Sequence, residues 1–286
     1  MKVRPDFDSI SQKNDVFVNQ FSSLVFNNTD TLLLSYFCGL KTVSVYSIYL
    51  MMCNMINTIV DSISSSMTYQ FGFWYSTDKE KFTKAQKVFE RYYLCVVFWL
   101  YSVTLVFLIP FISLYTKGVT DANYVDAPLP FLFVGMQLLS YTKRPFNQVV
   151  NMAQKFKETK WRSVAEATIN ITISFFAVRK YGIYGVLLGS IVALSYRVID
   201  LIIFSNRILD NSILGSMENL VKDVICLCLV YCCTSGFVND LNNYLSVFFY
   251  AAVVTIFSGM LFFSVNLVGH KSDLHEIGRI LKRAFK

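Results

Sequence analysis

The sequence predicts an all-α protein, a polytopic transmembrane helix bundle of about eight spans. Apolar residues make up 54% of its 286 residues and charged residues only 16%. A soluble domain averages about 25% charged residues, so this composition is that of an integral membrane protein. Most apolar residues fall into eight segments, each approaching the roughly 20 residues that a spanning helix needs. The segments cover residues 15–38, 42–70, 92–115, 128–152, 162–178, 182–205, 219–237 and 243–267.

Basic residues indicate which side of the membrane each connection faces. Of the 26 Lys and Arg residues, nineteen lie in stretches that eight spans would place on the side of the termini, four lie opposite, and three lie within spans. An excess of this kind marks the cytoplasmic side, so we expect both termini in the cytoplasm. The basic residues form no continuous face, which argues against a nucleic-acid partner.

The chain divides into four predicted parts. Residues 1–13 form a cytoplasmic N-terminal segment without the apolar core of a signal peptide, and 14–207 form a six-helix transmembrane lobe. Residues 208–267 add a helix pair, and 268–286 form a basic cytoplasmic tail. The stretch from Tyr75 to Arg91 is expected to be an amphipathic linker with Phe82 and Phe89 on the membrane surface, either as a plain anchored loop or as a site for anionic lipid.

The first two spans carry polar residues at membrane depth. Asn27-Asn28-Thr29-Asp30 interrupts the first span, and Asn54, Asn57 and Asp61 share one face of the second. Such residues either hydrogen-bond between helices or face a substrate or ion. The last two spans show no charge inside the membrane, so we expect them to pack on the outside of the bundle.

The fourth span contains Lys143-Arg144-Pro145. Charges inside a span mark functional sites by default, although these side chains could also snorkel to the interface. A guanidinium suits a phosphate or pyrophosphate, and Pro145 can open the helix towards a cavity. A polar stripe runs along this helix through Gln137, Ser140, Arg144, Asn147 or Gln148, and Asn151.

The next two spans continue the polar pattern. The fifth places Ser163, Glu166, Asn170 and Ser174 on one face, and the spacing of Ser163 and Glu166 equally fits a helix-capping box. The sixth begins with glycines suited to close helix packing, and an interfacial ion pair is expected at its inner end. These residues are Gly182, Gly185 and Gly189, and Arg197 with Asp200.

Residues for enzyme chemistry are scarce. The seven cysteines lack the spacing and His partners of a zinc site, and His270 and His275 lie in the charged tail. We therefore expect no metal, no cofactor and no enzymatic activity.

Several motifs resemble polysaccharide-transport proteins of the multidrug/oligosaccharidyl-lipid/polysaccharide exporter superfamily. The motifs are NNTDTLLLS at 27–35, Arg144-Pro145, the turn from Asn151 to Lys157, EATIN at 166–170 and GIYGVLLGS at 182–190. The resemblance implies the second lobe of a two-lobe flippase plus an extra helix pair. It implies translocation of lipid-linked oligosaccharide units, such as those of O-antigen, capsule or teichoic-type polymers, across the cytoplasmic membrane of a bacterium.

Within this function, the charged and polar residues inside the spans lead us to expect the following roles. Substrate binding would fall to Arg144, Lys143, Asn147, Asn151, Glu166 and Asn170, and ion coupling to Asp30 and Asp61. The expected partners are membrane lipid and a polyprenyl-linked oligosaccharide. Because alternating access needs two bundles, a separate N-terminal half or a second copy of the chain is a further expected partner, and the chain by itself is not expected to transport.

Two other functions stay open from the sequence. One is a cation antiporter of the multidrug and toxin extrusion type. The other is a membrane polysaccharide polymerase or ligase, which would need a long external loop with catalytic residues. The longest external loop expected here, about 116–127, contains no His or Arg.

The predicted topology can be tested with reporter fusions at Lys286 and near Ala122. We expect the two fusions to report opposite sides of the membrane, with Lys286 in the cytoplasm, because of the charge imbalance. Reporters that signal the same side would overturn this topology.

Overall fold

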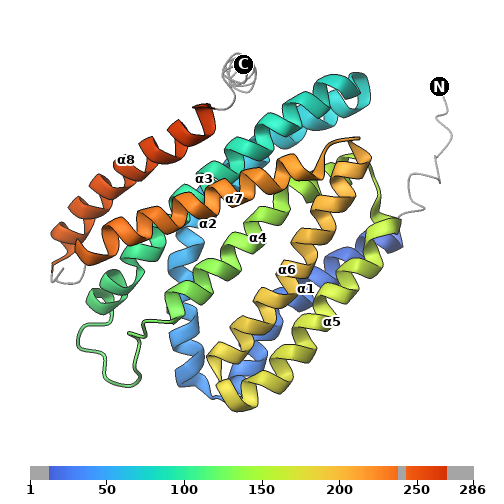
Figure 1. The fold of residues 1–286 in the computed structure, drawn as a ribbon. Coiled ribbons are helices and arrows are strands. Elements are labelled where there is room, and N and C mark those ends of the chain that lie inside the picture. The colour runs from blue at the N-terminus through green and yellow to red at the C-terminus, as the bar shows by residue number, and fades with distance from the viewer. Residues whose placement is uncertain (1–12, 238–242, 269–286) are drawn as a thin grey trace, which may run out of the picture.

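The computed structural model describes residues 13–237 and 243–268 and is all-α, as predicted (Figure 1). Eight α-helices and one short 3₁₀ turn make up its regular structure, and this part of the chain contains no strand. The predicted N-terminal segment, except for Lys13, and the predicted basic tail beyond Val268 lie outside the described residues. Each predicted apolar segment corresponds to one helix.

The helices are α1 (Lys13–Phe37), α2 (Leu40–Thr77), α3 (Lys79–Tyr115), α4 (Leu129–Met152), α5 (Phe156–Tyr181), α6 (Ile183–Ile208), α7 (Ile213–Thr234) and α8 (Tyr244–Val268). Four of them, α2, α3, α6 and α8, are long and apolar enough to cross a membrane. This finding suggests a membrane protein. The charged residues within the predicted spans lie mostly on the other helices, for example Asp30 on α1, Lys143 on α4 and Glu166 on α5.

The helices pack as two connected groups. α5 lies between α1 and α6, and α4 packs on α6; α3 packs on α2, α4, α7 and α8. Connections after α2, α4 and α6 lie at one end of the bundle, and those after α1, α3 and α5 lie at the other (Figure 1). The predicted topology assigns the first of these ends to the cytoplasm.

The expected amphipathic linker between the second and third spans is instead the tip of a helical hairpin. α2 ends at Thr77 and α3 begins at Lys79, so residues 75–91 are helical except at the turn. Phe82 and Phe89 are buried, with ring centroids 5.8 and 5.2 Å from that of Phe71, and do not face outward. Their apolar spacing therefore reflects packing between two helices rather than contact with a membrane surface.

α7 and α8 pack against the outer side of α3, as expected (Figure 1). In contrast to the prediction, an acidic residue is buried between them. Asp223 on α7 is fully buried and accepts a hydrogen bond from Asn266 on α8 at 3.1 Å. Nearby, Asn206 on α6 donates to Ser216 on α7 at 3.1 Å. Because buried polar groups need hydrogen-bond partners, these contacts help to fix how α7 and α8 pack on the bundle.

Close packing of α5 on α6 depends on two of the three predicted glycines. A side chain at Gly185 would lie 2.5 Å from the carbonyl group of Ala177, and one at Gly189 would lie 2.9 Å from the backbone nitrogen of Ser174. Gly182 differs, because a Cβ there would meet only Cys38, at 3.8 Å. It has a φ of +53° and forms the turn between α5 and α6, a conformation that glycine adopts at little cost.

We predict that Gly185→Ala destabilises the protein by about 1–3 kcal/mol, because the added methyl group forces α6 away from the α5 backbone. Thermal unfolding in detergent measures the effect. Gly135→Ala on α4 is the matched control, since its Cβ would meet open space. Equal unfolding temperatures for the two variants would contradict the close-packing interpretation.

Candidate functional site

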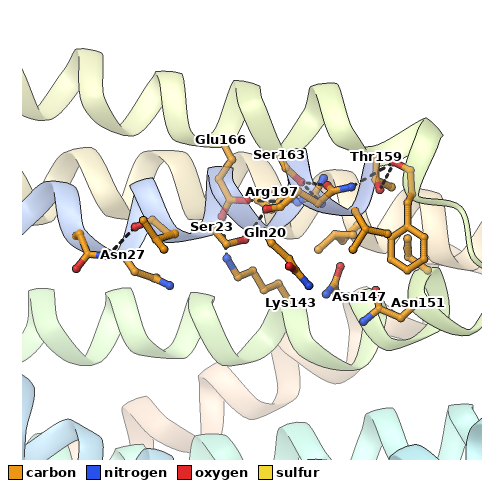
Figure 2. A pocket seen from close by; sticks show the side chains of 17 residues that line it. Gln20, Ser23, Asn27, Lys143, Asn147, Asn151, Thr159, Ser163, Glu166 and Arg197 are labelled. Atoms are coloured by element: carbon orange, nitrogen blue, oxygen red, sulfur yellow. Dashed lines mark hydrogen bonds and ion pairs between the residues drawn. The ribbon is translucent and has the colours of Figure 1, made fainter. Parts of the chain in front are cut away.

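The larger polar cavity of the bundle has a volume of about 640 Å³ and lies between α1, α4, α5 and α6 (Figure 2). Its walls come from the first half of α1, the last part of α4, the first part of α5 and the last part of α6. All these parts lie towards the predicted cytoplasmic end. The volume falls in the range of about 300–1,000 Å³ that is common for small-molecule sites.

Carboxamides and hydroxyls dominate the polar wall. The carboxamides belong to Asn19, Gln20, Asn27, Asn28, Asn147 and Asn151, and the hydroxyls to Ser23, Thr159 and Ser163. Both groups can donate and accept hydrogen bonds, as sugar hydroxyls do. The wall therefore suits a neutral, hydroxyl-rich ligand along most of its length.

Three charged side chains meet in this cavity from three different helices. Glu166 on α5 binds Lys143 Nζ on α4 at 2.8 Å through Oε1, and Arg197 Nε on α6 at 3.4 Å through Oε2. Figure 2 shows the three side chains directed towards one another. The capping-box interpretation of Glu166 is wrong, because α5 begins at Phe156, well before Ser163.

Arg197 is the most deeply buried of these charges, with 5% of its side chain exposed. Besides Glu166 it binds Asp200 at 3.0 Å and donates to Ser163 Oγ at 3.0 Å. Asp200 also binds Arg162, at 2.5 Å. The predicted Arg197–Asp200 pair is present, and the Arg197 side chain is buried in the bundle.

The hydroxyl of Ser163 extends this network to α1. It donates to Asn19 Oδ1 at 2.6 Å, and Asn19 Nδ2 donates to the Phe156 carbonyl at 3.3 Å. Near the same end, Lys160 binds Asp15 at 2.6 Å. The first helix is thus held to α5 by polar contacts beside the cavity.

A smaller cavity of about 300 Å³ lies deeper in the bundle, between α1, α2, α4 and α6. Asn27 lines both cavities, so the two are neighbours. The smaller one is lined by Asp30, Asn54, Asn57, Gln137, Ser140 and Arg144, among others. Several residues of the predicted polar stripe on α4 therefore face this second space.

Arg144 is tied to α2 in the smaller cavity. Its guanidinium forms an ion pair with Asp61 and lies 4.0 Å from the ring centroid of Tyr141. Tyr141 in turn donates to Asp61 at 3.4 Å. About a third to a half of each charged side chain is exposed, 37% for Arg144 and 47% for Asp61. The pair links α2 and α4 but stays within reach of water.

Asp30 is a nearly buried carboxylate beside the same cavity. Its Oδ2 accepts from Ser190 at 2.7 Å and from Tyr46 at 3.3 Å, whereas its Oδ1 has no hydrogen-bond partner among the described residues. Asn170 is fully buried and donates to Ser190 at 2.8 Å. Asn170 therefore supports the position of Asp30 through Ser190 and lines neither cavity.

The structure divides the residues predicted to bind substrate between the two cavities, and it places Asp30, predicted to couple an ion, beside Arg144. Lys143, Asn147, Asn151 and Glu166 line the larger cavity, while Arg144 and Asp30 line the smaller one. Gly182, Gly185 and Gly189 lie at the α5–α6 turn and contact, away from both. Sequence reasoning missed the central place of Arg197 and the contribution of Asn19, although the position of Arg197 within an apolar segment was a usable signal.

Comparisons with known proteins give no identification. No protein-family model, curated protein or solved structure matches this chain.

Proposed function

We propose that this chain moves a lipid-linked oligosaccharide across the membrane, acting as one helical lobe of a flippase. The observation that carries the proposal is the larger cavity, in which six carboxamides and three hydroxyls surround a small group of charges. Sugar rings are recognised by such donors and acceptors. A phosphate that joins the sugar to its lipid would be attracted by Lys143 and Arg197.

The position of the cavity supports the same proposal. It borders α1 and α4, which lie on opposite sides of it (Figure 2). α1 also exposes an apolar face through Phe17, Phe21 and Leu24, and Leu24 is part of the cavity wall. A ligand with a polar head and an apolar tail could place its head in the polar cavity and its tail along the apolar face of α1.

The charges favour this function over extrusion of cations. The connected ion pairs contain three cationic side chains, Lys143, Arg162 and Arg197, and two carboxylates, Glu166 and Asp200. The formal excess of one positive charge repels a cationic drug and attracts an anionic ligand.

We predict that Asn147→Leu combined with Asn151→Leu, introduced at the chromosomal locus, abolishes surface polysaccharide, because both carboxamides leave the cavity wall. Lectin staining of intact cells measures surface polysaccharide, and extraction of membrane lipids measures the untransported intermediate, which should accumulate. Chromosomal replacement keeps any partner bundle present. Asn123→Leu, in the exposed connection between α3 and α4, is the matched control and should leave both quantities unchanged.

Normal surface polysaccharide in the double variant, with the protein present in the membrane at its usual level, would reject the proposed function. A change in resistance to cationic drugs without a change in polysaccharide would favour an antiporter instead.

A further inference from the structure

In the ion pair between Lys143 and Glu166, the two side chains differ in how many other charged partners they have. Arg197 has three partners: it forms ion pairs with Glu166 and Asp200 and donates a hydrogen bond to Ser163. Glu166 likewise has a second cation, Arg197, on its other oxygen. For Lys143 the structure shows one anionic partner, Glu166, and the ring of Phe26 at 5.2 Å. If Glu166 left Lys143, the carboxylate would still be paired and only the lysine would need a new anion.

Access to Lys143 is also greater. All three side chains line the cavity, but a quarter of the Lys143 side chain is exposed, against 9% for Glu166 and 5% for Arg197. An anion entering the cavity would therefore reach the lysine ammonium first. The excess positive charge of the connected ion pairs means that one added negative charge brings the group to neutrality, which lowers the cost of holding these charges away from water.

The helices around this ion pair are arranged so that separating Lys143 from Glu166 would break few other contacts between α4 and α5. α4 packs on α6 and α3, and α5 packs on α6 and α1. Among the described residues, Lys143–Glu166 is the one side-chain hydrogen bond between α4 and α5. Replacing it does not require other polar contacts between these two helices to be broken.

We propose that Glu166 is a resident counter-anion that a phosphate group of the ligand displaces from Lys143. Without ligand, Glu166 neutralises a lysine that would otherwise be costly inside the membrane. When a phosphate enters the cavity, it takes the ammonium of Lys143, and Glu166 remains bound to Arg197. This inference rests on the proposed function for its ligand, and it assigns Glu166 a role opposite to direct substrate binding. The phosphate could belong to a lipid-linked sugar or be free in solution, and the chemistry at Lys143 is the same.

Binding of inorganic pyrophosphate to the full chain in phosphatidylcholine nanodiscs, measured by calorimetry, tests the exchange. Glu166→Gln removes the competing charge but keeps hydrogen-bonding atoms, so we expect pyrophosphate to bind about tenfold more tightly or better. Lys143→Gln should lose the binding. Lys160→Gln, which removes a lysine paired with Asp15 outside the cavity wall, is the matched control and should bind like the unmodified chain.

The sign of the Glu166→Gln effect separates exchange from a purely structural ion pair. If the unmodified chain binds pyrophosphate, then unchanged or weaker binding in Glu166→Gln, in protein whose unfolding temperature shows that it is folded, would overturn the proposal, as would full binding by Lys143→Gln. A second arm uses a polyprenyl phosphate in the nanodisc, detected by native mass spectrometry. Lysine-dependent binding of this lipid with none of free pyrophosphate would assign the site to lipid-linked phosphate and support the exchange there, provided that Glu166→Gln strengthens it.

The test is independent of transport. Tighter pyrophosphate binding in Glu166→Gln, together with normal surface polysaccharide in the Asn147→Leu and Asn151→Leu double variant, would keep the anion exchange and reject the flippase proposal. The opposite pair of results would reject the exchange alone.

Discussion

The buried guanidinium of Arg197 is the constraint on which the cavity depends. A buried charge is tolerated only when its bonds are satisfied by protein or water, and Arg197 meets this need by binding Glu166, Ser163 and Asp200. Ser163 passes the network to Asn19 on α1, and Glu166 passes it to α4. One side chain on α6 thereby positions polar groups of three other helices around a common space.

The other features of the bundle leave that space open. α5 approaches α6 closely because Gly185 and Gly189 lack side chains, and this brings Glu166 within reach of Arg197. α4 lies on the other side of α6 and carries Lys143 to the same carboxylate. The close packing of α5 on α6 therefore holds Glu166 and Arg197 in place. Lys143 reaches Glu166 from α4 through a flexible, partly exposed side chain. This asymmetry is what makes exchange at Lys143 physically reasonable.

The eight helices could be predicted because long apolar segments separated by basic connections are typical of membrane-spanning helices and of few other structures. Which side chains contact one another was harder to predict.

Lys143 and Arg144 are adjacent in sequence, but neighbouring helical side chains point about 100° apart, so they enter different cavities. Asp200 is three residues from Arg197, a spacing that the sequence reveals. Glu166 and Ser163 contact Arg197 only because α5 packs on α6. Phe82 and Phe89 show the same limit, since apolar spacing does not distinguish a membrane surface from a partner helix.

The proposed function requires that the larger cavity beside α1 holds water within a membrane-embedded bundle. Two cysteines on that helix test it in a chain whose seven native cysteines are replaced. Ser23 lines the larger cavity, whereas Leu32, which is 67% exposed, lines neither cavity. Because thiols react as thiolates in water, a membrane-impermeant maleimide added to inverted vesicles should label Ser23→Cys and leave Leu32→Cys unlabelled. Equal labelling at both positions, or none at Ser23→Cys, would contradict the account.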